Sequence, residues 1–268
     1  LTIPDSFGLG VEFVEKEGPV FNNPINSSTD ISNLDHFDPE SLDYVYKAVK
    51  NIKNSLSEEI PLIGFCGSPW TLAAYSIEGR SSKDFEKTLN FLVSNQKDVH
   101  NLLTKYTDAC FLYLRRQVQS GADVIQIFDS WANLLTKEGL IEYSFNYINA
   151  LISALKLDPV TKNIPVIVFA RNPKCNIEEL INTSADCISL FWSMNDLNFE
   201  LAKNKVAIQG NLDPKILLES DEIIKRETYK ILEKFEKYPG YIFNLGHGIT
   251  PDINPDKIKY LTNIVREY

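Results

Sequence analysis

One histidine stands in a setting typical of a ligand-binding loop. Residues 244–248 read NLGHG, so His247 has a glycine on each side and follows a short apolar segment. Glycine permits unusual backbone angles and a close approach of a ligand, and imidazole exchanges protons near neutral pH. We therefore expect His247 to be functional, in preference to a histidine packed in a turn.

A tyrosine and a serine follow two other apolar segments. Tyr75 lies among small residues, one helical turn into the segment after 60–66, and Ser130 follows Phe128 and Asp129. The pattern leaves Tyr75 open between a functional hydroxyl and a core tyrosine. A cap on the next turn is the commoner role of a serine such as Ser130. Without a Gly-x-Ser-x-Gly sequence around it, a nucleophilic serine is not expected.

Charged and aromatic residues at the same strand ends leave two interpretations open. Arg171 suits either contact with an anionic ligand or a solvated loop, and Asp129 and Asp213 suit either an acid or a turn. Three tryptophans follow expected strands and could stack on a flat ligand or pack at the mouth of the fold. They are Trp70, Trp131 and Trp192.

Strand and helix alternate along the chain, and this alternation predicts an α/β fold with a parallel sheet. The expected strands are residues 62–66, 124–128, 166–169, 187–190, 206–209 and 241–244. The expected helices are 39–56, a segment after Pro69, and about 82–94, 95–119, 137–156, 176–183, 196–203, 214–218, 221–236 and 255–268. Near the start, residues 11–13 and 19–21 predict a hairpin with a polar turn at 15–18, and 22–38 predict a polar loop.

Six strands fit either an open doubly wound sheet or part of a (β/α)₈ TIM barrel, which has eight. The chain begins with Leu1 and not with Met, which favours a barrel whose first two strands lie upstream of Leu1. We expect residues 1–268 to form a single barrel domain that is truncated at its N-terminus. Groups at the carboxyl ends of its strands, including Tyr75, Ser130 and His247, should then meet at one mouth.

Composition argues against several classes of protein. With a net charge of -9, the chain is not expected to bind nucleic acid or an anionic membrane surface. No apolar run reaches the length of about 18 residues that indicates a transmembrane helix. The four cysteines are widely spaced without a C-x-x-C pair, and only three histidines are present. Reduced thiols in a cytoplasmic protein are therefore expected, and a zinc site is not.

Four segments, in chain order, resemble the uroporphyrinogen decarboxylase family. They are residues 60–79 (IPLIGFCGSPWTLAAYSIEG), 121–131 (GADVIQIFDSW), 207–214 (AIQGNLDP) and 241–250 (YIFNLGHGIT). Residues 1–5 and the hairpin up to Phe21 are similar to that family too. The resemblance therefore extends over essentially the whole chain, and several independent blocks agree.

This resemblance implies a (β/α)₈ barrel that acts as a cytoplasmic homodimer without cofactor or metal. The implied activity is that of a carboxy-lyase, which removes carbon dioxide from the four acetate side chains of uroporphyrinogen III and gives coproporphyrinogen III in heme and tetrapyrrole biosynthesis. It also implies catalytic roles for Tyr75 and His247, and substrate-binding roles for Tyr75, Ser130 and His247. These groups would hydrogen-bond and orient the acidic side chains of the substrate.

The chain departs from the family pattern in several places. An arginine-rich motif resembling RQAGRY and the aspartate of a short F-S-D-type motif are absent. These supply the family's main anion clamp and the carboxylate that faces the pyrrole, where positive charge develops; Asp5 belongs to a different family position. Phe191 stands where the family commonly has Asp, and Arg171-Asn172 where it commonly has Lys-Gly. We therefore expect the chain as written to be inactive and its longer parent to be active.

Two other functions compete with this interpretation. The cobamide-dependent methyltransferases related to this barrel use a zinc site with His-x-Cys spacing, whereas His247 is followed by Gly248 and Ile249. The second competitor is a catalytically dead porphyrinogen-binding protein, supported only by the absent N-terminal motifs. Metal analysis tests the first, and a turnover assay tests the second.

Overall fold

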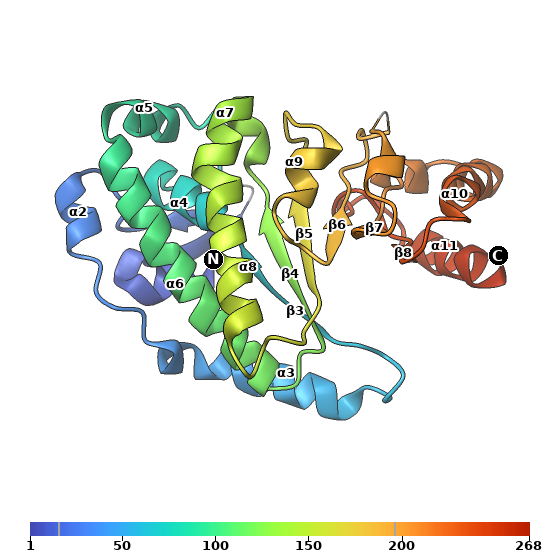
Figure 1. The fold of residues 1–268 in the computed structure, drawn as a ribbon, viewed down its shortest axis with the longest axis horizontal. Helices are drawn as coiled ribbons and strands as arrows, with labels where there is room; N and C mark the ends of the chain where they lie inside the picture. The colour runs from blue at the N-terminus through green and yellow to red at the C-terminus, as the bar shows by residue number, and fades with distance from the viewer. Residues whose placement is uncertain (16, 196) are drawn as a thin grey trace.

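A six-stranded sheet is the central feature of the computed structural model, which describes residues 1–15, 17–195 and 197–268. All neighbouring strands in this sheet are parallel (Figure 1). The strands are β3 (Ile63–Gly67), β4 (Val124–Asp129), β5 (Val166–Ala170), β6 (Cys187–Ser189), β7 (Ala207–Gln209) and β8 (Tyr241–Ile242). Every expected strand is therefore present, with ends that differ by one or two residues.

The order of these strands decides between the two architectures that the sequence left open. A doubly wound sheet reverses its order at a switch point, but here the order β3-β4-β5-β6-β7-β8 follows the chain without reversal. That succession of βα units is the arrangement of a (β/α)₈ barrel. The described residues form six such units, and the prediction of a TIM-barrel fold is confirmed.

Helices pack beside the sheet, and α6 and α8 run alongside each other next to β3 and β4 in Figure 1. Between β3 and β6 the chain forms α4 (Pro69–Glu78), α5 (Glu86–Ser94), α6 (Gln96–Gln119), η3 (Ala132–Leu134), α7 (Lys137–Gly139), η4 (Leu140–Phe145), α8 (Asn146–Leu157) and α9 (Ile177–Ile181). Later elements are η5 (Phe199–Leu201), η6 (Pro214–Leu218), α10 (Asp221–Phe235) and α11 (Pro255–Glu267).

A hairpin and short helices precede the sheet. They are α1 (Thr2–Pro4), η1 (Asp5–Leu9), β1 (Val11–Val14), β2 (Gly18–Phe21), α2 (Ser28–Ser32), η2 (Pro39–Leu42) and α3 (Asp43–Ser55). The expected hairpin is confirmed, because β1 and β2 pair antiparallel. Position 16 of its expected turn lies outside the described residues.

The expected polar loop at 22–38 is wrong in its centre, where α2 forms. Ser27 caps this helix by accepting a hydrogen bond from the backbone N–H of Asp30, whose carboxylate accepts from the backbone of Ser27 in return. This reciprocal capping satisfies the first backbone donors of a short helix. A sequence rich in Ser, Asn and Asp therefore indicated a helix start here as well as a loop.

Other expected helices are shorter or interrupted. The helix expected at 82–94 begins only at Glu86, because Phe85 has a left-handed backbone with φ of 49°. The helix expected at 137–156 contains the π-helical segment η4 between α7 and α8. Of the helix expected at 196–203, position 196 lies outside the described residues, and the rest forms only the single 3₁₀ turn η5.

Burial differs between the middle and the ends of the sheet. All five residues of β5 are buried, as expected for a strand covered on both faces. In β3, by contrast, Ile63 and Phe65 are 43% and 59% exposed, and in β8 Ile242 is 44% exposed. The middle of the sheet is therefore covered on both faces, whereas its two outer strands are not.

Candidate active site

A cavity of about 330 Å³ lies at the carboxyl ends of the strands, where a barrel places its active groups. It receives side chains from β4, β5 and β6 and from the segment after β8. The lining residues are Gln126, Phe128, Ser130, Phe169, Ser189, Asn244, Leu245, His247 and Gly248. Two of the three side chains singled out in the sequence, Ser130 and His247, therefore line one cavity.

His247 is held by its backbone and by aromatic rings. The neighbouring Gly246 N–H donates to the carbonyl of Leu212 at 2.8 Å, which ties the loop to the end of β7. The imidazole ring meets Phe169 and Phe191 edge-on, with centroid distances of 6.3 and 5.9 Å. Because the side chain is also exposed, it can present a ring nitrogen to a ligand in the cavity.

The two glycines beside His247 serve a purpose other than the one expected from the sequence. Neither has a positive φ. A Cβ on Gly246 would lie 2.4 Å from the backbone nitrogen of Trp192, whereas one on Gly248 would meet no atom within 4 Å. Gly246 is therefore required by the close approach of the β6 loop, and Gly248 leaves open space beside the imidazole.

Ser130 presents an uncommitted hydroxyl. It directly follows β4 and is half-buried, and its side chain forms no hydrogen bond within the described residues. The next helical turn, η3, has Trp131 at its N-cap position and no side-chain cap. The commoner role of a serine at such a position, capping the following turn, is therefore not the role that Ser130 has here.

Tyr75 is not among the residues that line the cavity. Both ends of its helix α4 are fixed, since Ser68 caps the start and Gly79 ends the helix in a left-handed conformation. The half-buried tyrosine ring packs against Phe85 at 5.8 Å and Trp131 at 5.6 Å. Burial raises the pKa of its hydroxyl, so this group remains a protonated hydrogen-bond donor near neutral pH.

Asp129 is the structural anchor of this end of the fold. Its side chain is fully buried and accepts hydrogen bonds from Ser68 and Thr71, each at 3.1 Å, and from Ser144. Burial raises the pKa of its carboxyl group, and these hydrogen bonds only partly oppose that shift. Of the two interpretations that the sequence left open, the structure supports a structural role.

The three tryptophans divide between core and surface. Trp70 is fully buried, and its indole N–H donates to the carbonyl of Trp131 at 3.0 Å. Trp131 is 9% exposed and packs between Phe85 and Tyr75. Trp192 is 37% exposed and contacts Phe191. Trp70 and Trp131 are therefore core residues, whereas Trp192 belongs to the surface.

Three polar residues of the cavity were not singled out from the sequence: Gln126, Ser189 and Asn244. Gln126 is two residues before Phe128 and four before Ser130, and successive side chains of a strand point to opposite faces. Extending that alternation backwards from Ser130 would have found Gln126. Ser189 accepts a hydrogen bond from Gln209 at 3.0 Å, a contact between strands that no local pattern indicates.

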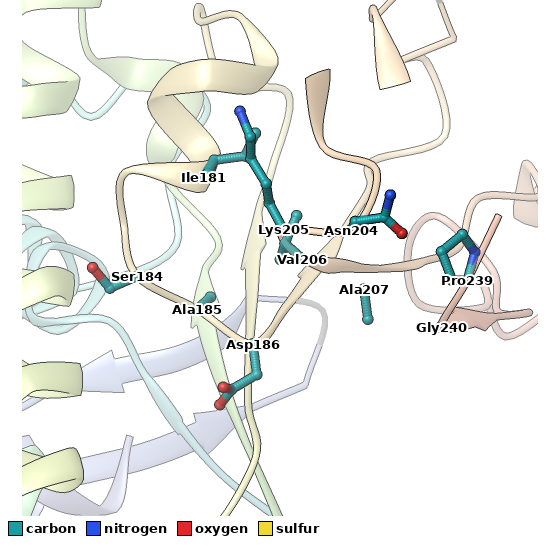
Figure 2. A pocket seen from close by; sticks show the side chains of 10 residues that line it. All are labelled: Ile181, Ser184, Ala185, Asp186, Asn204, Lys205, Val206, Ala207, Pro239 and Gly240. Carbon is teal, nitrogen blue, oxygen red and sulfur yellow. The ribbon is translucent and has the colours of Figure 1, made fainter. Parts of the chain in front are cut away.

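A second cavity, of about 630 Å³, lies at the other end of the sheet (Figure 2). Most of its lining residues lie just before β6, β7 and β8, and they include Asp186, Lys205 and Gly240. In Figure 2 the side chains of Asp186 and Lys205 point in opposite directions, and Asp186 pairs with Lys156 at 2.6 Å. Size alone therefore does not identify the active site, because this cavity faces away from the carboxyl ends of the strands.

The described part of the chain lacks a cluster of metal-binding side chains and a membrane-spanning helix. Residues 1–15, 17–195 and 197–268 contain no group of three or more His, Cys, Asp or Glu side chains placed to hold a metal ion. Within the same ranges, no helix has the length and apolar character needed to cross a membrane.

Comparison with solved structures supports the fold. A methyltransferase from Methanosarcina mazei superposes with a TM-score of 0.79 over 99% of this chain and 77% of its own, at 17% sequence identity. A B12-independent methionine synthase from Shewanella sp. W3-18-1 gives a TM-score of 0.57 over 96% of this chain and 74% of its own, at 13% identity. At such low identity these similarities establish the architecture alone.

Sequence comparison is more specific. The family model described as Uroporphyrinogen decarboxylase (URO-D) matches residues 1–268. The uroporphyrinogen decarboxylase of Ruthia magnifica is 42% identical over 271 residues, which cover 100% of this chain and 78% of the relative. That of Legionella pneumophila (strain Corby) is 39% identical, covering 100% of this chain and 76% of the relative. The chain therefore belongs to the uroporphyrinogen decarboxylase family.

Proposed function

We propose that this protein is a uroporphyrinogen decarboxylase, a carboxy-lyase that converts uroporphyrinogen III to coproporphyrinogen III. The observation that carries the proposal is the match to this family over residues 1–268, together with 42% identity to a relative of that name. The barrel fold is compatible with it but hosts many other activities.

The chemistry makes two demands on the site. An acetate on a pyrrole carbon has no carbonyl group to accept electrons when carbon dioxide leaves, so the pyrrole ring must be protonated and act as the electron sink. The substrate must also be held so that one acetate at a time is aligned for bond cleavage. Both demands favour a site with hydrogen-bond donors around a hollow, and the cavity at the carboxyl ends of the strands has this character.

We assign the donors of this site as follows. His247 and Tyr75 act as catalytic residues, and they and Ser130 bind the substrate's acidic side chains. The positions of Ser130 and His247 on the wall of one cavity support this assignment, and the protonated hydroxyl of Tyr75 suits a carboxylate-binding role. We assign Asp129 no role in stabilising charge on the substrate, because its buried carboxyl group already accepts hydrogen bonds from three hydroxyl groups.

We further propose that the protein acts in heme and tetrapyrrole biosynthesis as a cytoplasmic homodimer. The pathway follows from the proposed reaction, and the dimer from the family resemblance. Support for a reducing compartment comes from the four cysteines at positions 66, 110, 175 and 187, all of which lie within the described residues and are unpaired.

An anaerobic turnover assay tests the proposed reaction. Protein expressed from its complete reading frame should convert uroporphyrinogen III to coproporphyrinogen III, resolved by chromatography after oxidation to the porphyrins. We expect His247→Asn to lower kcat/KM about a hundredfold or more, and Ser130→Ala to raise KM about tenfold. His36→Asn is the matched control, since this histidine is exposed and lies far along the chain from the cavity residues.

The outcomes separate the competing functions. Conversion that depends on His247 but not on His36 supports the decarboxylase. Methyl transfer with stoichiometric zinc, and no decarboxylation, would support the methyltransferase to which the fold is similar. Tight binding of uroporphyrinogen without any turnover would instead support a porphyrinogen-binding protein.

A further inference from the structure

An arginine lies over an indole ring beside the cavity. Arg171 directly follows β5, and its backbone N–H donates to the carbonyl of Asp129 at 2.9 Å, so its position is fixed against the end of β4. Its guanidinium carbon is 5.4 Å from the centroid of the Trp131 ring. A cation over an indole face is electrostatically favourable and restricts the arginine to one side of the ring.

Arg171 differs from most other arginines of this chain in having no carboxylate partner. Arg80, Arg115, Arg116 and Arg226 each form an ion pair, at 3.9, 3.0, 3.0 and 2.8 Å. Within the described residues no aspartate or glutamate lies at ion-pair distance from the guanidinium of Arg171, although Asp129 is its neighbour across the sheet. That carboxyl group is turned away and is already bonded to three hydroxyls.

The groups around Arg171 are donors as well. The hydroxyl of Tyr75 lies close enough to feel its charge, which lowers the pKa of the tyrosine against the larger, opposite effect of burial. The indole N–H of Trp131 is buried and interacts with the Tyr75 hydroxyl, whose pKa it lowers. A guanidinium, a phenol and an indole N–H therefore lie together, and no described carboxylate side chain is paired with them.

This cluster borders the cavity. Phe169 lines the cavity and Arg171 is two residues further on, which is the spacing of side chains on one face of a strand. Ser130, another lining residue, is adjacent in sequence to Trp131. A ligand that fills the cavity and extends past Ser130 and Phe169 would therefore meet the guanidinium of Arg171.

We propose that Arg171, whose guanidinium lies over the ring of Trp131, binds a carboxylate side chain of the substrate. We also propose that Tyr75 donates a hydrogen bond to the same carboxylate. The proposal deepens the proposed function and rests on it for the identity of the substrate. Its chemical basis is independent, because a guanidinium offers paired N–H donors that match the two oxygens of a carboxylate. Arg171 is in this view a specificity-determining residue and does not take part in proton transfer.

Three variants and a non-reacting probe test the proposal. The probe is uroporphyrin III, the oxidised fluorescent form of the substrate, whose binding is measured by fluorescence without turnover. Arg171→Gln removes the charge and keeps much of the length, and Arg171→Lys keeps the charge but loses the paired donors. Arg226→Gln is the control, since Arg226 is an exposed arginine of α10 that pairs with Glu227.

We expect Arg171→Gln to weaken uroporphyrin binding about tenfold to a hundredfold and Arg171→Lys to weaken it less. Arg171→Gln should also flatten the dependence of affinity on salt, because one ion pair is removed. In turnover, KM should rise more than kcat falls, since the contact is made in the ground state and transition state alike. A merely structural role would lower stability to urea without changing the salt dependence.

Binding by Arg171→Gln within about twofold of the wild type would overturn the proposal. If this variant does not fold, Arg171→Lys and the salt dependence of the wild type decide, and wild-type affinity independent of salt would overturn it too. Failure of the proposed function can be distinguished from failure of the Arg171 proposal. A wild type that makes no coproporphyrinogen refutes decarboxylation, while an Arg171-dependent affinity for uroporphyrin would still establish the carboxylate site.

Discussion

Substitution of Asp129 tests how this end of the barrel is held together. The carboxyl group accepts hydrogen bonds from Ser68 and Thr71, which begin helix α4, and from Ser144 in η4. It therefore joins the strand that precedes Ser130 to the helix that carries Tyr75. Because all of these groups are buried, removing the acceptor leaves donors without partners and without access to water.

The expected loss in the free energy of unfolding follows from the number of those donors. Asp129→Ala orphans three hydroxyls, each worth about 1–3 kcal/mol when left unsatisfied. The Ser68 hydroxyl still accepts from the backbone of Thr71 at 3.0 Å, but its O–H is left without an acceptor. We expect the free energy of unfolding to fall by about 3–5 kcal/mol for Asp129→Ala and about 1–2 kcal/mol for Asp129→Asn, which keeps one acceptor oxygen.

The pH dependence gives a sharper test than the magnitude. Burial raises the pKa of Asp129 in the folded protein, so the folded state binds a proton more tightly than the unfolded state does. Stability from this group is then fully present below its ordinary pKa and is lost as the pH rises toward the folded pKa. The penalty of Asp129→Asn should therefore be largest in acid and should shrink as the pH rises.

Asp158→Asn is a control with the opposite sign. Burial acts to raise the pKa of Asp158. Hydrogen bonds from Arg115 at 3.0 Å and from the backbone of Val160 and Thr161 outweigh burial and hold this pKa below its ordinary value. Its stabilisation is present above that ordinary pKa and is lost in acid. The penalty of Asp158→Asn should therefore grow with pH and reach no more than about 1 kcal/mol, as is usual for an ion pair near the surface.

Urea unfolding of both variants and the wild type, from about pH 4 to about pH 8, measures the two trends through the midpoint at constant slope. If the penalty of Asp129→Asn grew with pH, the buried carboxylate would be stabilised in its charged form and the reasoning would be refuted. A penalty below about 0.5 kcal/mol at every pH would show that the three hydroxyls find other partners.

Three further predictions concern Gly246, Phe191 and Tyr75. Gly246→Ala should lower the free energy of unfolding by about 1–3 kcal/mol in urea, since its Cβ would meet the Trp192 backbone at 2.4 Å, and Gly248→Ala should be neutral because its Cβ meets nothing within 4 Å. Phe191→Leu should lower kcat/KM about two- to tenfold by removing the ring edge against His247; an unchanged value would show that the ring does not orient the imidazole. Because burial raises the pKa of Tyr75, KM for uroporphyrinogen should stay constant from about pH 7 to about pH 9, and a rise in KM there that Tyr75→Phe abolishes would contradict this.

The strands could be predicted from the sequence because a buried parallel strand is a continuous apolar run bounded by polar residues. Helix boundaries were harder to predict from the sequence. The start of α5 depends on the left-handed backbone of Phe85, and Phe85 is fully buried against Trp131 at 4.2 Å. A contact between positions far apart in sequence decides that boundary, and local propensity does not report it.

The candidate site shows the same limit. Residue type and strand-end position predicted Tyr75, Ser130 and His247 at one mouth; Ser130 and His247 line the cavity, and Tyr75 does not. The roles of Asp129 and Gly246 could not be predicted, because the first depends on hydroxyls from two other elements and the second on the approach of the Trp192 backbone. The sequence shows which residues lie at strand ends, but not which of them face one another.

The distribution of charge, more than its total, determines whether this protein suits a substrate rich in carboxylates. The chain has 36 acidic residues and a net charge of -9, which by itself would repel such a substrate. Yet no acidic residue is among those that line the cavity, and the acid nearest to it in sequence, Asp129, is buried with its carboxyl group enclosed by hydroxyls. Arg171 remains at the edge without a carboxylate partner in the described residues. Because interactions between exposed charges fade beyond about 8–10 Å in physiological salt, a bound carboxylate would feel this local arrangement far more than the distant negative surface.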